Sequence, residues 1–474
     1  MAVAPLKWDP VNHLLSRFAF GPTAAARTQV GKSGAQAWYD SQVALAHTKV
    51  GYRGLPKAAL TAMPYLALSI PDVTIAMIDA GEEFGWTAMD QLLQATLGLQ
   101  IYSPAQLYET LVDFFSNHLN VANHNGDVWN TRLAYDRDVI RKYATGSFTD
   151  MLLASGRHPA MLRFLNLAES TAAAINENYG RELLELHTVG LNYTETDVRG
   201  AATLLTGRMV GPDEQYFYDR IIHPLGAVTV LGFSHANTSR LDGDKGGDQL
   251  LTYLASHPKT ATHLATKLCM RFVSDTPSSD LIAAVAQAYL SSGTQILPMV
   301  ETILRSQEFW QSRGAKIRRP AENLVATVRI IGNQVSDWSA ATSTLSWMTE
   351  SVGNQPLEWP APNGYPDVAA AWRNAGSMLA LWNLQLGFAS DWPDGFAPLD
   401  KTTLYGAHPP ATSGAAITAL TRRLTGMTFT TAQRQALQTF LGEPASTPLA
   451  DSTLAWMLEP LLALILHGPH HAMR

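Results

Sequence analysis

Cysteine is almost absent from this sequence of 474 residues, which contains only Cys269. One cysteine excludes an internal disulfide bond and a zinc site built from several thiolates. It does not identify the redox compartment, because exported bacterial proteins can also lack disulfides.

Charge is scarce as well. Only 16% of the residues are charged, against 46% that are hydrophobic, and the net charge of -6 comes without any cluster of basic residues. The sequence therefore carries no electrostatic signal for nucleic acid or for an anionic membrane surface, and we expect neither as a partner. Its apolar content is high enough to build a sizeable core, which excludes a disordered chain.

Long apolar runs are also missing. No uninterrupted apolar stretch reaches the roughly 20 residues that cross a bilayer, so we expect no transmembrane segment. The N-terminal residues show no basic segment followed by an apolar one, and as written the chain carries no signal peptide. Taken alone, this predicts a cytoplasmic protein.

The patterns that are present predict a mainly α protein, a large single body of many helices without a flexible linker. Residues 216–233 are the exception, since their β-branched and aromatic residues predict a small β-ribbon. Four prolines within residues 356–367 predict an extended, stiff loop that could form one wall of a pocket or simply a strap. We divide the chain into an N-terminal helical part (1–100), a central helical core (101–335), and the proline-rich loop with C-terminal helices packed on the core (336–474).

Residues 176–190 carry the strongest chemical signal. In an α-helix, Asn178, Arg181, Glu182 and Glu185 would share one face, while the flanking residues are apolar. Burying such groups unpaired costs several kcal/mol, so they need partners: one another, a metal or a substrate. His187 should point away from this face and serve a structural role.

Four other residues could join this face or bind a ligand. His118 lies on the apolar stripe of a helix that starts near residue 106, so it faces inward, either as a hydrogen-bonded core histidine or as a ligand or acid-base group. His223 should lie on a loop beside the ribbon. Arg318 and Arg319 could grip an anionic group, or they could be solvated charges at a helix entrance.

Five motifs together resemble the bacterial DUF1800 family, a domain of unknown function. They run in order along residues 10–390 and comprise HLLSRFAFGP from residue 13, FSNH from 115, NENYGRELLELHTVG from 176, YTETDV from 193 and PNGYPD from 362. The resemblance implies export and a phosphatase-like partner protein, but no activity. Where the family tends to have His-Asp, this chain has His223 followed by Pro224, which weakens that pair as a ligand set.

Three hypotheses follow. The first is an enzyme with Glu182, Glu185, Arg181, Asn178 and His118 as catalytic residues, with or without a divalent metal held by Glu182, Glu185, His118 and His223. The second is a metal-free carboxylate enzyme acting on a glycan. Its weakness is that Glu182 and Glu185 lie on adjacent helical turns, about 5–6 Å apart at Cβ, whereas a water held between two carboxyl groups needs roughly 6.5–9.5 Å.

The third hypothesis is a non-catalytic binding or assembly protein. Here Arg181 with Glu185, and Asn178 with Glu182, are internal bridges that hold helices together. Structural ion-pair networks of this kind resemble active sites closely.

Overall fold

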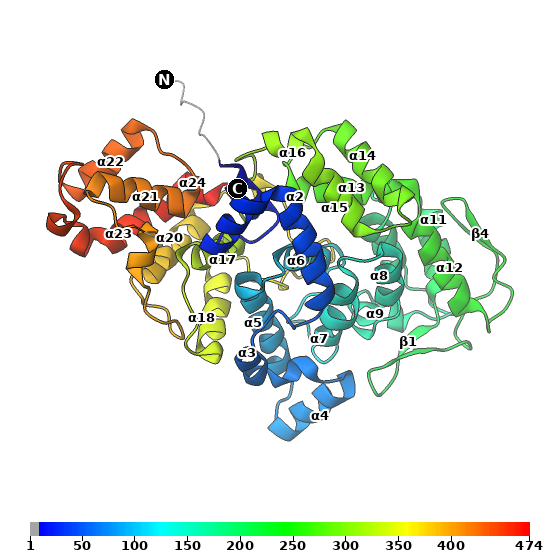
Figure 1. Ribbon diagram of the computed structural model, residues 1–474. Coiled ribbons are helices and arrows are strands. Elements are labelled where there is room, and N and C mark those ends of the chain that lie inside the picture. Colours follow the sequence, from blue (N-terminus) through cyan, green and yellow to red (C-terminus); the bar gives the residue numbers. More distant parts are fainter. Residues whose placement is uncertain (1–8, 407) are drawn as a thin grey trace.

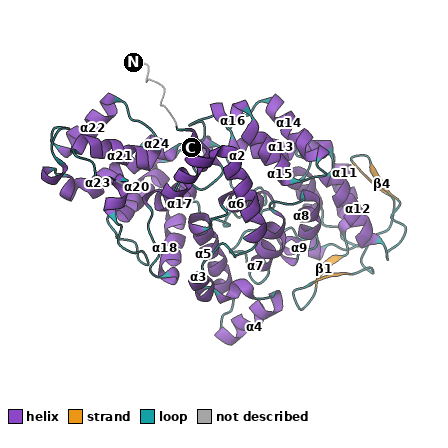
Figure 2. Cartoon of the chain, viewed as in Figure 1, coloured by secondary structure: helices purple, strands orange, loops and turns teal. Residues whose placement is uncertain are grey.

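The computed structural model describes residues 9–406 and 408–474, and helices make up most of its regular structure (Figures 1 and 2). The chain is 61% helical, with 24 helices in the described part, so the prediction of a mainly α fold is confirmed. Within these residues, no helix combines the length and the apolar character needed to cross a bilayer.

The first half of the chain carries eleven of these helices. They are α1 (Pro10–Arg17), α2 (Ala24–Thr48), α3 (Lys57–Ala62), α4 (Ile70–Ala80), α5 (Trp86–Tyr102), α6 (Gln106–His118), α7 (Arg132–Tyr135), α8 (Phe148–Ser155), α9 (Pro159–Phe164), α10 (Asn178–Glu182) and α11 (Glu195–Leu205).

The remaining helices follow a short β segment. They are α12 (Gly243–Ala255), α13 (Pro258–Phe272), α14 (Ser279–Ser291), α15 (Ile296–Arg305), α16 (Gln307–Gln311), α17 (Pro320–Ile331), α18 (Trp338–Ser351), α19 (Ala369–Trp372), α20 (Ala375–Ala389), α21 (Ser413–Thr425), α22 (Thr431–Leu441), α23 (Leu454–Leu466) and α24 (Pro469–Ala472).

The β segment forms two small sheets at one end of the molecule (Figure 2). In the first, β1 (Arg208–Val210) pairs antiparallel with β2 (Tyr216–Tyr218), and in the second, β3 (Val228–Val230) pairs with β4 (Phe233–His235). The sequence predicts a single ribbon, but the structure has two hairpins. Strand β2 pairs with the preceding strand β1, and β3 pairs with the following strand β4.

The buried apolar side chains form three clusters. Residues 1–100 contribute to all three clusters: Leu14 belongs to the first, Leu93 to the second and Leu92 to the third. The division into parts at residues 100 and 335 stays a prediction, and the clusters cross its bounds. The one cysteine, Cys269, is buried in the first cluster on α13.

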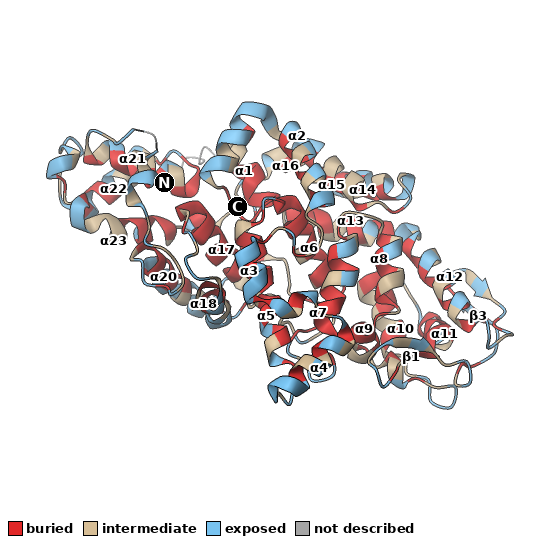
Figure 3. Cartoon of the chain, turned by 60° about the horizontal axis from the view of Figure 1, so that its bottom comes forward, coloured by how far each residue is buried: buried red, intermediate tan, exposed pale blue. Residues whose placement is uncertain are grey.

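Helices α6 and α17 run through the middle of the molecule (Figures 1 and 3). All twelve residues of α17 are buried, from Pro320, whose fixed φ suits a first helical position, to Ile331 before the left-handed Gly332. In α6, only Asp113 and Asn117 are partly exposed. The buried polar side chains of these two helices must therefore find partners inside the protein.

We expect residues 176–190 to form one continuous α-helix, but the structure shows a different arrangement. After α10 the backbone widens into a π-helical turn, Leu183–His187. Such turns are rare and frequently occur at functional sites. The following helix, α11, begins with a capping box, in which Thr194 and Asp197 exchange hydrogen bonds.

Candidate functional site

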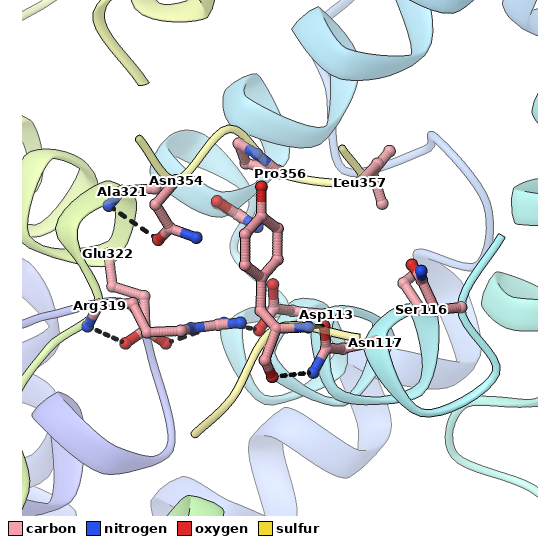
Figure 4. A pocket seen from close by; sticks show the side chains of 12 residues that line it. Asp113, Ser116, Asn117, Arg319, Ala321, Glu322, Asn354, Pro356 and Leu357 are labelled. Carbon is pink, nitrogen blue, oxygen red and sulfur yellow. Dashed lines mark hydrogen bonds and ion pairs between the residues drawn. The ribbon is translucent and has the colours of Figure 1, made fainter. Parts of the chain in front are cut away.

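Two neighbouring cavities lie under the proline-rich loop, beside α6, α13 and the first turn of α17. The larger, of about 150 Å³, is called the polar cavity below, and the smaller measures about 20 Å³. Both are lined by Asp113, Asn117, Arg319 and Tyr365. Figure 4 shows the smaller one, where the side chain of Arg319 runs past Glu322 toward Asp113.

A network of buried charges surrounds these cavities. Arg319 donates to Asp113 and, at 3.3 Å, to Glu322. Glu322 also pairs with Arg271 at 2.5 Å and with Arg474 at 3.3 Å. Burial alone would raise the pKa of Glu322, but the three guanidinium groups hold it well below its ordinary value. Glu322 is therefore ionised, and Asp113 and Asp367 supply further negative charge, since Asp113 also pairs with Arg271 and Asp367 with Arg474.

All three of these guanidinium groups, Arg474 included, have a buried Nε without a hydrogen-bond partner among the described residues. Two of the three, Arg271 and Arg319, line the polar cavity. An orphaned buried donor is costly, and an anionic group in the cavity would remove that cost. The interpretation of Arg318 and Arg319 as solvated charges is wrong, since each is only 6% exposed.

His118 and Lys267 meet at the wall of the polar cavity. As predicted, His118 faces inward and is 1% exposed. Its Nε2 lies 3.1 Å from the carbonyl oxygen of His187 and its Nδ1 lies 2.9 Å from Nζ of Lys267. These contacts indicate a neutral ring that donates through Nε2 and accepts through Nδ1. Burial, followed by the charge of Lys267, holds the pKa of His118 well below its usual value.

Lys267 is the most unusual group of the site. Burial lowers its pKa to about 8, and the negative charge of Asp367 offsets only part of that effect. A lysine in this range is partly neutral near physiological pH, and a neutral amine can accept a proton or act as a nucleophile. Lys267 lines the polar cavity, so an entering molecule would contact it.

Two more histidines flank this pair. The ring centroids of His187 and His263 lie 6.4 and 6.0 Å from that of His118. His263 donates through Nε2 to the carbonyl oxygen of Leu186 at 3.2 Å, whereas neither ring nitrogen of the fully buried His187 has a partner in the described chain. Burial lowers the pKa of His187 to about 3 and that of His263 to about 4.

The proline-rich loop is held over the cavities by amides from α6 and the residues that follow it. As predicted, residues 356–367 form neither helix nor strand, and six of them line the two cavities. Asn120 donates to the carbonyl oxygens of Trp359 at 2.9 Å and Ala361 at 2.7 Å. The loop is thus a wall of the site, one of the two interpretations that the sequence left open.

The predicted carboxylate face is only half-buried. Glu185 accepts a hydrogen bond from the hydroxyl of Tyr193. No hydrogen bond or ion pair joins Glu182 to another of the described residues, and burial, followed by the charge of Glu185, raises its pKa. Neither carboxylate lines the polar cavity or its smaller neighbour. The connection is indirect, because the same π-helical turn supplies the His187 carbonyl that His118 binds.

The other two polar residues of that face also find separate partners. Arg181 pairs with Glu195 at 2.7 Å, across the turn to α11, and Asn178 donates to the carbonyl oxygen of Leu165 at 3.3 Å. The expected internal bridges, Arg181 with Glu185 and Asn178 with Glu182, are not formed. The reason is that the α10–α11 connection brings Glu195 back over Arg181.

The predicted metal set receives no support from the structure. His223 is fully buried, with Nδ1 at 2.6 Å from the carbonyl oxygen of Thr206 and Nε2 at 2.8 Å from Oδ1 of Asn237. Both nitrogens of His118 are likewise engaged. In residues 9–406 and 408–474, no three His, Cys, Asp or Glu side chains are grouped in a way that could hold a metal ion.

Sequence reasoning missed Lys267, Arg271 and Asp367. A signal for the first two was present, because His263, Lys267 and Arg271 recur every four residues along α13. This spacing places three basic groups on one face of a helix that also carries a long apolar stripe. Asp367 gives no comparable signal, since only the folded loop brings it near α13.

Fold and site together define a mainly helical protein with a charged, partly enclosed cavity beside a buried histidine cluster. Residues 13–473 match a family model described as "Protein of unknown function (DUF1800)", and the chain belongs to this family. No curated protein and no solved structure matches the chain.

Proposed function

We propose that this protein is an enzyme acting on a small molecule with an anionic group, and that Lys267 is its reacting base or nucleophile. The observation that carries this proposal is the contact of Lys267 Nζ with Nδ1 of buried His118 at the wall of a 150 Å³ cavity. A reactive amine needs a lowered pKa, a fixed position and access to substrate.

The amine is positioned by His118, whose ring is itself held in place. The His118 ring accepts from Lys267 and is itself anchored on the His187 carbonyl. The neutral ring adds no positive charge of its own. His118 therefore acts as a positioning residue, and because its ring accepts from the amine, this contact does not use the lone pair of a neutral Lys267.

The anionic part of the substrate would lie against Arg271 and Arg319. Their unused Nε–H groups are directed donors, and charge-assisted hydrogen bonds to a carboxylate or phosphate are about twice as strong as neutral ones. With its anionic group bound to these two arginines, the substrate could present its reacting part to Lys267.

Carbamoylation by cyanate tests the proposal, because cyanate is a small anion that modifies neutral amines. At pH 8 the neutral fraction of Lys267 should be roughly a hundredfold larger than that of an ordinary lysine of pKa 10.5. Peptide mass spectrometry should therefore find Lys267 modified faster than the exposed Lys259 on the same helix, with sulfate giving protection. Slower modification of Lys267 than of Lys259 would exclude a reactive amine there.

A matched variant separates positioning from simple burial. His118→Phe keeps an apolar ring but removes the acceptor, so the pH midpoint of Lys267 modification should shift while Lys259 is unaffected. An unchanged midpoint would remove His118 from the proposed role.

Binding without chemistry is the second candidate, and the extent of the buried ion-pair network favours it. In that case Lys267→Met should leave sulfate binding, measured by thermal shift, nearly unchanged, and no turnover of any anionic substrate should appear. The enzyme proposal also predicts that Lys267→Met keeps sulfate binding within about tenfold. It differs in predicting turnover of an anionic substrate by the wild-type protein, and loss of that turnover in Lys267→Met.

The Glu182 and Glu185 face stays a prediction, as do a divalent metal and a glycan substrate. The raised pKa of a partnerless Glu182 supports keeping it. Elemental analysis of the purified protein, with Glu182→Gln and Glu185→Gln, tests the metal, and thermal shift with oligosaccharides tests the glycan. Export and the phosphatase-like partner also stay predictions, testable by fractionation and by pull-down.

A further inference from the structure

A second and larger cavity lies on the other side of the first turn of α17. It has a volume of about 630 Å³ and is bounded by α17, α19, α20 and the end of α23 with α24. Of these helices, α17, α20, α23 and α24 lie together in Figure 1. Neighbouring residues face the two sites, since Arg318 lines this cavity and Arg319 lines the polar one. Most of its lining is apolar, including Trp372, Met378, Leu381, Trp382, Leu466 and Met473.

The buried charged group of this apolar cavity, Arg318, is already engaged, whereas Arg373 at its edge is exposed and makes no hydrogen bond or ion pair with the described residues. Arg318 donates to the carbonyl oxygens of His471 and Met473 and to Oγ of Ser16. His467 donates through Nε2 to the Trp382 carbonyl oxygen at 2.7 Å. No carboxylate is among the lining residues. A charged ligand would therefore find no unpaired buried countercharge there, since Arg318 is engaged and Arg373 is exposed.

One buried polar atom is left without a partner. Gln385 lines the cavity and is 1% exposed. Its Nε2 donates to Oδ1 of Asn323 at 3.0 Å and to Oγ1 of Thr327 at 3.3 Å, which fixes the amide. The opposite atom, Oε1, has no hydrogen-bond partner in the described chain. A buried acceptor of this kind favours a ligand with a donor group.

We infer that this apolar cavity is a binding site for a small neutral molecule with an apolar body and one hydrogen-bond donor, such as an alcohol. Its volume falls within the roughly 300–1,000 Å³ of small-molecule sites, which are mostly apolar with few polar groups. The apolar body would contact the tryptophans and aliphatic side chains, and the donor would reach Gln385 Oε1. This site is independent of the chemistry proposed for the polar cavity.

Two isomeric probes test the inference with the full chain. 1-Octanol and heptyl methyl ether have the same atoms, but only the alcohol can donate. Titration calorimetry should show the alcohol bound about tenfold more tightly than the ether, because only the alcohol satisfies Oε1. Absence of binding by both, or equal binding, would overturn the inference.

Two variants locate the binding. Gln385→Leu removes the acceptor and should abolish the preference for the alcohol while ether binding persists. Met378→Trp, at a partly exposed position of the cavity wall, should weaken both probes at least tenfold. A preference unchanged in Gln385→Leu, or binding unchanged in Met378→Trp, would contradict the assignment. If Gln385→Leu does not fold, the wild-type preference and Met378→Trp decide the matter.

Discussion

The side chain of Asn117 binds the backbone of Tyr365 from both sides. Its Nδ2 donates to the Tyr365 carbonyl oxygen at 2.8 Å, and its Oδ1 accepts from the Tyr365 backbone nitrogen at 2.6 Å. An amide paired in this way imitates a β-bridge across 248 residues of sequence. It attaches the proline-rich loop to α6 beside the residues that line the polar cavity.

Replacing Asn117 should therefore release the loop. Asn117→Ala loses two hydrogen bonds, each worth about 0.5–1.5 kcal/mol, so unfolding in urea should show a loss of about 1–3 kcal/mol. Limited proteolysis should cut within residues 356–367 faster than in wild type. Asn125→Ala, which removes only a local bond to Asp127, is the control and should leave the cleavage rate unchanged.

Gly364→Ala should have a similar effect for a steric reason. Gly364 has φ of 68°, and a Cβ there would lie 2.2 Å from the backbone oxygen of Asn117. Gly353→Ala is a matched control, because its φ is 70° but its nearest neighbour is 4.0 Å away. Both variants carry the left-handed strain of about 1–2 kcal/mol. Only Gly364→Ala should also displace the loop and lower sulfate binding, and equal behaviour of the two would refute the close contact.

Stability should fall steeply below pH 6.5. Burial is the main cause that lowers the pKa of four histidines from 6.5 to about 3: His13, His158, His187 and His471. Between these values the unfolded chain binds protons that the folded chain does not, so the free energy of unfolding decreases as pH falls. Each histidine contributes up to about 1.4 kcal/mol per pH unit in this window.

Urea unfolding at pH 7, 6 and 5 measures this slope. His187→Leu removes one of the histidines that bind a proton only in the unfolded chain, so the slope should decrease by about 1.4 kcal/mol per pH unit. The substitution should be tolerated, because neither ring nitrogen of His187 has a partner among the described residues. The exposed His47→Leu should leave the slope as it is. An identical slope in all three proteins would mean that His187 does not titrate in this way.

Arg141 should be among the most sensitive positions for stability. It is 1% exposed and pairs with Asp136 at 2.6 Å and Glu109 at 2.9 Å, both equally buried. Arg141→Met leaves two carboxylates buried without their cation and should cost about 3–5 kcal/mol. Arg305→Met breaks the exposed pair with Glu301 and should cost less than about 1 kcal/mol. Comparable losses in urea unfolding would contradict this difference.

Local patterns in the sequence predict local structure well in this protein. The capping residues Thr194 and Asp197 mark the start of α11, and the apolar stripe of α6 indicates that His118 faces inward. The prolines of residues 356–367 exclude helix and sheet there. Each of these predictions depends on neighbours a few residues apart.

The site itself depends on distant residues. Asp113, Arg319 and Asp367 meet only because α6, α17 and the proline-rich loop pack together, and nothing in their local sequence indicates that meeting. The π-helical turn is likewise decided by packing, so the helical periodicity assumed for Glu182 and Glu185 does not hold. The spacing of basic residues on α13 was the one signal for Lys267 that the sequence offered.

The lone thiol offers a practical tool. Cys269 lies two positions from Lys267 on α13 and is fully buried, and burial raises its pKa to about 12. In the native state it should resist alkylating reagents. Timed exposure to a thiol-specific reagent would therefore report how often α13 separates from its neighbours, with no engineered label and no competing thiol.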